Sequence, residues 1–380
     1  MTKILIAGTD YGLQNVGDDA ILGAMLEQFR SLDGVEITVA TKNAGPMAEW
    51  LGVKTVECAG KFNLLKVYRE IFSADVLVVG GACVISDYQA GLKGLISGYP
   101  GFGISLIATA KLLRKPVMVY AIGVEEIHSK LKKFFVKWAY NLADVITLRD
   151  QGSLDLLRDG FGVTKPKMEV TADPVMGMSA PSELSVKEQA AKLGCFKDDK
   201  PVVAISFAYG VDTRAELIQF VADMSDYVVN GLGANVLFIP MNIIASNDRA
   251  GVLKVVEKME RSDAVEVLEL PYGYEEVLAL LGSVDLVISS RMHLLIFSSI
   301  TMTPIVGISR VPKTNQYLNF FGLKALVSTD NLEFSSVQSD LADAWENRDA
   351  IKNALQSNRE EMFNRSWRNF RLFKDNIISR

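Results

Sequence analysis

The chain has 380 residues, which is too long for one hydrophobic core and predicts two domains of roughly 150–200 residues each. Apolar residues make up 49% and charged residues 22%, a globular balance that excludes a disordered or fibrous protein. A formal net charge of −5 leaves no basic surface for nucleic acid, so we expect no nucleic-acid partner.

The N-terminus favours a cytoplasmic protein. Residues 1–6 lead straight into an apolar strand, without the basic region and cleavage site of a secretory signal. The longest apolar candidate for a membrane span, Gly101–Leu113, is too short and contains Lys111. Three widely spaced cysteines match neither a disulfide framework nor a metal site. We therefore expect a cytoplasmic chain without a bound metal.

In its first half the chain alternates short β-branched apolar runs with longer helical segments such as Asp18–Ser31 and Lys130–Leu142. This alternation is typical of βα units and a parallel sheet. Polar, Ser- and Lys-rich sequence then places a domain boundary at residue 175. The predicted strands of this half are Ile4–Ala7, Ile37–Ala40, Val76–Val79, Val117–Ala121, Val145–Leu148 and Met168–Thr171.

A second series of the same kind begins at Val202–Phe207. Its further predicted strands are Val236–Ile239, Val265–Leu268, Leu286–Ser289 and Pro304–Ile308. We therefore expect an α/β protein with two doubly wound, Rossmann-like domains in tandem, residues 1–175 and 176–330. Residues 331–380 predict a helical tail, for which packing back on the first domain is one option. Ligands of such sheets bind at the carboxyl ends of the strands.

A glycine-rich turn follows the first predicted strand and opens the first predicted helix. It contains Asn15, Gly17 and Asp18, and Asp19 follows directly. Glycines allow a tight turn, and a helix N-terminus presents N–H groups to an anion. Adjacent carboxylates would repel a phosphate, however, so the pair suits hydroxyl recognition or proton transfer better. Capping of the helix by the aspartates is the structural alternative.

A second glycine turn, Gly80-Gly81, ends the strand that begins at Val76. Either it is a close-packed turn, or its backbone N–H groups line the ligand cleft. Cys83 follows, but no histidine lies near it in sequence, and we interpret it as a small buried residue rather than a nucleophile.

The turn Ser290-Arg291-Met292-His293 is the most informative stretch, because it follows a buried strand and opens an apolar helix. Arginine binds a carboxylate or phosphate in a bidentate fork. Histidine moves protons near neutral pH. The structural alternative is a histidine that packs the helix and an arginine in an ion pair.

Two further basic residues stand after predicted strands. Lys313 follows the strand that ends at Ile308, and Arg149 follows Val145–Leu148. Both add positive charge at carboxyl ends of strands. The lysines Lys130, Lys132, Lys133 and Lys137 interleave with Leu131, Phe134, Phe135 and Trp138. This pattern fits either a helix face on anionic lipid or an ordinary helix with solvated lysines.

These motifs, in this order, resemble the polysaccharide pyruvyl transferase family, from residue 4 to residue 323. The matching elements are Asn15–Leu22 (the family's Gly-Asp-Glu-Ala turn, with Asp19 for the glutamate), Gly80-Gly81, Thr147–Asp150 (an Arg-Asp element), Ala172–Pro174, Ser290–His293 followed by Phe297 (an Arg-Leu/Met-His turn) and Pro312-Lys313. The chain departs from the family pattern at Ala82, Ser86 and Ala121–Glu125.

The resemblance implies transfer of pyruvate from phosphoenolpyruvate to two hydroxyls of a sugar in a surface or capsular polysaccharide precursor. The product is a cyclic ketal, and phosphate is released without a cofactor. It implies His293 as the catalytic acid and Asp18 as the residue that orients or deprotonates a hydroxyl. The implied substrate-binding residues are Arg291, Lys313, Arg149, Met292, Ser290, Asn15, Gly17, Gly80 and Gly81.

The resemblance places the acceptor sugar on the first domain and phosphoenolpyruvate on the second. It leaves open a free or a lipid-linked acceptor and, with the lysine-rich helix, a location at the inner face of the cell membrane. The main alternative function is a GT-B-type glycosyltransferase that uses a nucleotide sugar, since two-domain folds of this kind host both activities. A non-catalytic sugar-binding relative is the third.

Overall fold

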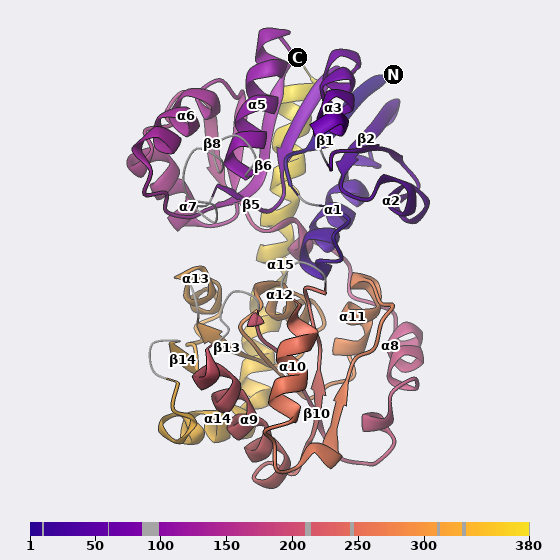
Figure 1. Cartoon of the computed structure of the whole chain (residues 1–380), viewed down its shortest axis with the longest axis vertical. Helices are drawn as coiled ribbons and strands as arrows, with labels where there is room; N and C mark the ends of the chain where they lie inside the picture. The colour runs from indigo at the N-terminus through magenta and orange to yellow at the C-terminus, as the bar shows by residue number, and fades with distance from the viewer. Residues whose placement is uncertain are drawn as a thin grey trace. The chain divides into compact units, whose positions relative to one another are not determined.

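The computed structural model describes residues 1–9, 11–59, 61–85, 99–209, 214–243, 247–309, 312–328 and 332–379 (Figure 1). The side chains of 61–62, 83–84, 99–100, 312–313 and 327–328 are not described. The chain forms two compact units. Unit 1 comprises Met1–Leu13, Ile21–Gly177 and Met362–Arg380, and unit 2 comprises Gln14–Ala20 and Met178–Glu361.

The sheet of unit 1 has eight strands among the described residues, and all its pairs are parallel. Seven strands follow the order β3-β2-β1-β4-β6-β7-β8, and β5 pairs with β6. The order reverses between β1 and β4, which is the switch point of a doubly wound sheet. The strands are β1 (Thr2–Ala7), β2 (Val35–Thr41), β3 (Lys54–Glu57), β4 (Val76–Gly80), β5 (Cys83–Ile85), β6 (Val117–Val124), β7 (Val145–Leu148) and β8 (Lys167–Val170).

The helices of unit 1 pack on its sheet. Apolar residues of α3, α5 and α6 form one buried cluster with the strands. Phe29 of α1 makes edge-to-face ring contacts with Phe370 and Phe373 of α15. The helices are α1 (Val16–Phe29), α2 (Ala44–Leu51), α3 (Lys61–Ser73), α5 (Tyr99–Leu112), α6 (Lys130–Tyr140) and α7 (Gln151–Asp155) with a following π turn (Leu156–Gly160).

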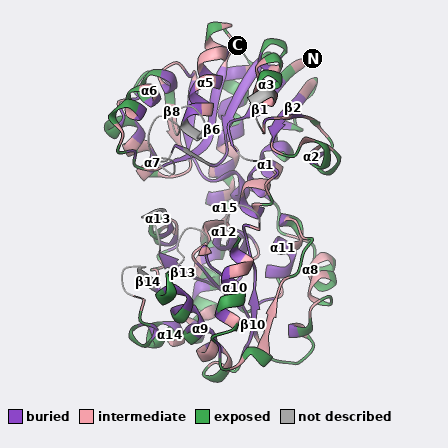
Figure 2. Ribbon diagram, in the orientation of Figure 1, coloured by how far each residue is buried: buried purple, intermediate pink, exposed green. Residues whose placement is uncertain are grey.

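Unit 2 repeats this plan with a parallel sheet in the order β11-β10-β9-β12-β13-β14, six strands in the described part of the chain. Its switch point lies between β9 and β12. The strands are β9 (Val202–Ser206), β10 (Asn235–Phe238), β11 (Val265–Val267), β12 (Leu286–Ser289), β13 (Ile305–Ser309) and β14 (Val327–Ser328). The helices are α8 (Glu183–Ala190), α9 (Ala215–Asn230), α10 (Asp248–Val256), α11 (Tyr274–Leu281), α12 (Met292–Ile300), α13 (Pro312–Phe320) and α14 (Gln338–Glu346). The central strands of both units are buried, whereas the edge strands β3, β8 and β11 are only partly buried (Figure 2).

The C-terminal helix α15 (Arg348–Phe373) begins in unit 2, and its residues from Met362 onward belong to unit 1. There, polar side chains bind the segment that follows β8. The Asn369 amide donates to the carbonyl of Ala172 at 2.9 Å, and Trp367 Nε1 donates to the carbonyl of Gly177 at 3.1 Å. The predicted fold class, two doubly wound α/β units in tandem with a helical C-terminal segment, is confirmed.

Cys195 lies buried beside the edge of the sheet in unit 2, where its backbone N–H donates to Glu266 Oε2 at 2.7 Å. Burial and the neighbouring Glu266 carboxylate raise the pKa of the Cys195 thiol to about 12. Because the thiolate is the nucleophile, we expect Cys195 in the folded chain to resist iodoacetamide at pH 8 and to react once urea unfolds it. Peptide mass mapping measures this, and rapid alkylation of Cys195 without urea would contradict it.

Candidate functional site

The turn after β12 lies at the switch point of the unit 2 sheet, and serine hydroxyls fix its shape. The Ser290 backbone N–H donates to the carbonyl of Ser206 at the end of β9, at 3.0 Å. Ser290 Oγ accepts from the backbone N–H of Ala208 at 3.0 Å. Ser289 Oγ accepts from the backbone N–H of Arg291 at 2.9 Å. These bonds hold Arg291 at the N-cap of α12, so the next two residues, Met292 and His293, open the helix.

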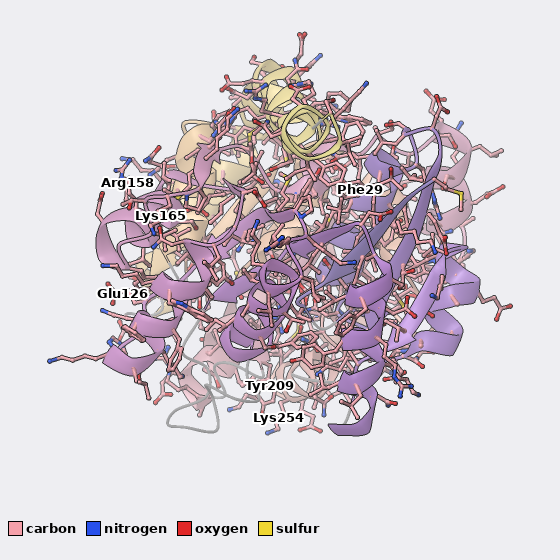
Figure 3. All side chains as sticks on the ribbon, turned by 90° about the horizontal axis from the view of Figure 1, so that it is seen from above. Phe29, Glu126, Arg158, Lys165, Tyr209 and Lys254 are labelled. Atoms are coloured by element: carbon pink, nitrogen blue, oxygen red, sulfur yellow. The ribbon has the colours of Figure 1, made fainter. Side chains whose placement is uncertain are left out.

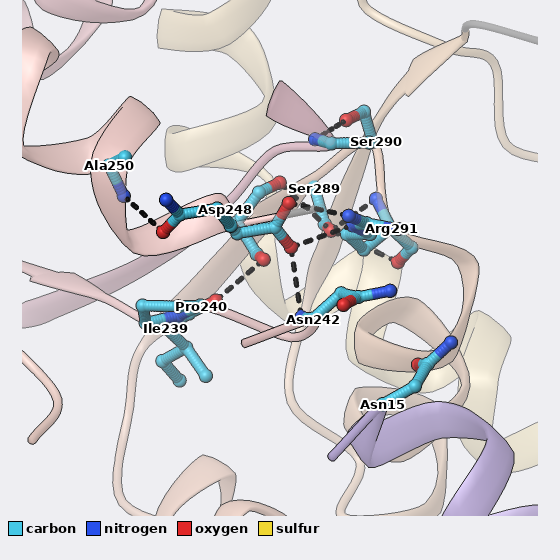
Figure 4. Close-up of polar contacts among 12 residues, drawn as sticks. Asn15, Ile239, Pro240, Asn242, Asp248, Ala250, Ser289, Ser290 and Arg291 are labelled. Carbon is cyan, nitrogen blue, oxygen red and sulfur yellow. Dashed lines mark hydrogen bonds and ion pairs between the residues drawn. The ribbon is translucent and has the colours of Figure 1, made fainter. Parts of the chain in front are cut away.

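Arg291 forms a bidentate pair with the buried Asp248, the first residue of α10 (Figure 4). Arg291 Nε donates to Asp248 Oδ2 at 3.0 Å, and a terminal nitrogen donates to Oδ1 at 2.5 Å. The exposed fraction is 18% for the Arg291 side chain and 1% for Asp248. A buried carboxylate needs such partners, and the pair fixes the plane of the guanidinium.

The loop between β10 and α10 also holds the Asp248 carboxylate in place. The backbone N–H of Asn242 donates to Asp248 Oδ2 at 3.0 Å. Tyr272 donates its hydroxyl hydrogen to the carbonyl of Pro240 at 2.5 Å. Burial, and then the nearby Asp248 carboxylate, raise the pKa of Tyr272 above its usual range, which keeps the phenol protonated. The sequence pattern does not single out Asp248, because an aspartate at a helix start is an ordinary capping residue, and no motif marks Asn242.

The glycine-rich turn before α1 pairs with this same loop, within unit 2 (Figure 4). Asn15 and Asn242 form an antiparallel bridge. The backbone N–H of Val16 donates to the carbonyl of Met241 at 3.0 Å, and that of Ile243 donates to the carbonyl of Gln14 at 3.2 Å. The first turn of α1 therefore sits with the loops of the second unit.

Gly17 packs directly against His293. A Cβ atom at Gly17 would lie 2.5 Å from Cγ of the imidazole and 2.9 Å from the Cβ of His293, which real side chains do not tolerate. The next residue, Asp18, accepts a hydrogen bond from the Asn15 side-chain amide at 2.7 Å. Asp18, which follows the glycine that packs on His293, and Arg291, two residues before that histidine, thus belong to adjoining turns at one corner of unit 2.

Tyr209 lies after β9, beside this corner, and packs against Gly251 of α10. Lys254 Nζ donates to the Tyr209 hydroxyl at 2.6 Å and lies 5.1 Å from the ring centroid (Figure 3). Lys313 lies in α13, which follows β13, but its side chain is outside the described residues.

The remaining predicted residues belong to unit 1. Gly80 and Gly81 end β4 at its switch point, with φ of 132° and 96°. The carbonyl of Gly80 accepts from the Tyr11 hydroxyl at 2.5 Å, and the N–H of Gly81 donates to the carbonyl of Tyr120 at 2.8 Å. Their positive φ and close packing explain why this turn needs glycine.

Arg149 follows β7 and is 90% buried, since its side chain has an exposed fraction of 10%. One terminal nitrogen donates to Asp173 Oδ2 at 3.2 Å. A Cβ at Gly123 would lie 2.7–2.9 Å from the guanidinium, so glycine at this position makes room for the arginine. The predicted departure at Ala121–Glu125 includes this glycine and Ala121, which has a φ of 47°. Ser86 lies outside the described residues.

Comparison with known proteins identifies the relatives of the chain. The family model described as polysaccharide pyruvyl transferase matches residues 15–310. No curated protein matches the chain in sequence.

Solved structures with GT-B-like folds are similar over the whole chain. MnaA of S. aureus, determined with UDP, is 13% identical with a TM-score of 0.66, covering 100% of this chain and 98% of that one. HepE of Anabaena in complex with UDP-glucose is 13% identical with a TM-score of 0.65, and both chains are covered completely. The UDP-GlcNAc 2-epimerase of Methanocaldococcus jannaschii is 12% identical with a TM-score of 0.63, covering 91% and 92% of the two chains. At such identities these likenesses establish the fold.

Proposed function

Because the chain belongs to the polysaccharide pyruvyl transferase family, a family of transferases, we propose that it transfers pyruvate from phosphoenolpyruvate to a sugar of a surface polysaccharide precursor. Two hydroxyls of one sugar would receive the same carbon, giving a cyclic ketal and inorganic phosphate. One observation carries this proposal most directly: Gly17 lets the first turn of α1 seat on His293, beside Arg291. In this proposal His293 is the acid, Asp18 the base and Arg291 the cation of one site.

The donor is a carboxylate and a phosphate on one carbon, so its site must hold negative charge. Arg291 is oriented by Asp248, and the N-terminus of α12 starts directly after it. Helix N-termini favour anions because their first N–H groups lack partners within the helix. Since Asp248 offsets much of the charge of Arg291, we assign Lys313 as a further donor-binding cation. Arg149, which is paired with Asp173 in unit 1, is proposed on the strength of the family motif.

The chemistry balances with the groups at this corner. His293 protonates the methylene carbon of phosphoenolpyruvate, which makes C2 an oxocarbenium ion. A sugar hydroxyl adds to C2 and loses its proton to Asp18. Phosphate then leaves with a proton, and the second hydroxyl adds to C2 and closes the ring. The proton lost by the first sugar hydroxyl balances the proton that His293 adds to the methylene carbon. The proton lost by the second hydroxyl balances the proton that leaves with phosphate.

The acceptor is proposed to be a sugar, either free or lipid-linked, handled by a cytoplasmic protein. The HepE structure contains UDP-glucose, so a nucleotide sugar is the donor to test against phosphoenolpyruvate. The two donors differ in what the site must bind, because a nucleotide sugar requires contacts for a base and a ribose as well.

A donor comparison tests the proposal. We expect phosphoenolpyruvate to raise the melting temperature of the chain, and to release phosphate only when a suitable acceptor sugar is present. If UDP-sugars raise the melting temperature and phosphoenolpyruvate does not, the glycosyltransferase alternative replaces this function. If neither donor has an effect, a non-catalytic sugar-binding role does.

The chain offers a matched test of the catalytic acid, because it has only two histidines. We expect His293→Ala to lower kcat for phosphate release by about 100-fold or more, the usual contribution of a general acid. His128→Ala, which changes an exposed histidine of unit 1, should leave kcat unchanged. Steady-state phosphate release measures both, and a His293→Ala enzyme with a wild-type kcat would exclude the imidazole as the acid.

A further inference from the structure

Helix α6 of unit 1 carries a ridge of exposed large apolar side chains. Leu131, Phe134 and Trp138 are 48%, 61% and 47% exposed. Their spacing of three and four residues places them on one face of the helix. The outer face of α6 is accordingly exposed in Figure 2. We call these three residues the α6 ridge.

The ridge is not part of the core that folds unit 1. The opposite face of α6 is buried, through Val136, Ala139 and Tyr140, in the cluster that covers the sheet. The helix is also capped, since Ser129 Oγ accepts from the backbone N–H of Lys132. Packing in the core therefore accounts for the apolar residues on the inner face of α6. The aromatic and aliphatic residues of the α6 ridge, on the outer face, are exposed to water instead.

The ridge stands in positive surroundings on an acidic protein. α6 contains four lysines and no acidic residue, although the chain as a whole has a net charge of −5. Lys130 and Lys137 are exposed beside the ridge, and the Lys133 ammonium lies 5.8 Å from the ring of the buried Phe161. Lys132 is only 2% exposed, so it does not belong to this surface, contrary to the pattern read from the sequence.

Neighbouring charges do not cancel this positive face. Lys165 is exposed on the same side of unit 1 as Arg158 and Glu126 (Figure 3). Arg158 pairs with Asp159 at 2.9 Å and with Asp155 at 3.3 Å, so this cluster of three side chains carries one excess negative charge. Among the described residues, the four lysines Lys130, Lys133, Lys137 and Lys165 still outnumber that charge and the exposed Glu126 together.

We propose that the α6 ridge inserts into the surface of an anionic lipid bilayer, with Lys130 and Lys137 on the lipid head groups. Aromatic and leucine side chains on one face, flanked by lysines, are the composition of helices that lie in a membrane interface. The eleven residues of α6 span about 16 Å, enough to lie along the surface. None of the described helices has the length and apolar character of a bilayer-spanning segment, so the contact is peripheral.

Vesicle flotation of the full chain tests membrane binding without an activity assay. Its result therefore does not depend on whether the chain transfers pyruvate. We expect binding to phosphatidylglycerol-containing vesicles, weaker binding to pure phosphatidylcholine, and loss of binding in high salt. Phe134→Ser with Trp138→Ser should reduce the partition coefficient about tenfold, as should Lys130→Gln with Lys137→Gln. Leu184→Ser with Lys187→Gln, on the exposed surface of α8, is the matched control and should bind like wild type.

Two results would overturn the proposal. One is vesicle binding that is absent, or unaffected by both α6 double variants. The other is a concentration-dependent dimer, seen in sedimentation velocity, that only the Phe134→Ser, Trp138→Ser variant loses, because the ridge would then be a contact between two copies of the chain. Unchanged circular dichroism of the variants excludes a folding defect.

Discussion

Gly17→Val is expected to lower the rate of phosphate release from phosphoenolpyruvate by about 1,000-fold, because it moves two proposed catalytic groups at once. A Cβ at this position overlaps the imidazole and the Cβ of His293, so a rotation of the ring alone does not relieve it. The turn of His293 or the first turn of α1, which carries Asp18, must shift. A displacement of about 1 Å is sufficient to cost about 100-fold at one group.

Gly45→Ala is the control for this substitution. Gly45 is an exposed glycine in α2, and a Cβ there meets nothing within 4 Å. It should leave the rate unchanged, because the added Cβ lies away from the turn that carries His293. A Gly17→Val enzyme with a wild-type rate would show that the corner formed by α1 and the His293 turn is not the site of reaction.

Asp248→Ala is expected to lower the free energy of unfolding of unit 2 by about 3–5 kcal/mol and to abolish phosphate release. The substitution leaves Arg291 without the buried carboxylate that accepts from it twice. Removing one partner of a buried ion pair leaves the other charge without a counter-charge, which lowers the free energy of unfolding by about 3–5 kcal/mol. Hydrogen exchange in urea, read from peptides of α10 and α12, measures the change within unit 2.

Two controls separate stability from catalysis. Asp263→Ala breaks an equally bidentate pair with Arg261, but Asp263 is 68% exposed, so the free energy of unfolding is expected to fall far less than in Asp248→Ala. Asp248→Leu combined with Arg291→Met replaces the buried pair by apolar side chains and should regain most of the stability without activity. If Asp248→Ala lowers the free energy of unfolding no more than Asp263→Ala does, the ion pair between Asp248 and Arg291 does not stabilise the turn of Arg291.

Most strands were predictable because they are central and apolar. Strands such as β1, β4 and β9 are buried on both faces of a parallel sheet, so they appear in the sequence as continuous β-branched runs. The sequence pattern does not predict β3, because Lys54–Glu57 is a short run of mixed polarity at the edge of its sheet. β14 consists of only two residues, too short for any periodicity.

The order of strands and turns also predicted where the candidate residues would stand. Ser290–His293 follows β12 at a switch point, and Gly80-Gly81 ends β4 at the other. The partner of Arg291 was not predictable, because Asp248 lies 43 residues away in the chain, where a helix cap explains it equally well.

The sequence by itself determined the α/β class, the tandem of two doubly wound units and the turns that carry polar residues. These features depend on local periodicity and on the residues that end strands, and both can be recognised in short stretches of the sequence. Only the tertiary structure decided that the first turn of α1 belongs to the second unit, that Gly17 seats against His293, and that Asp248 holds Arg291. Each of these contacts joins segments far apart in sequence, so it depends on how the loops pack and not on any local pattern.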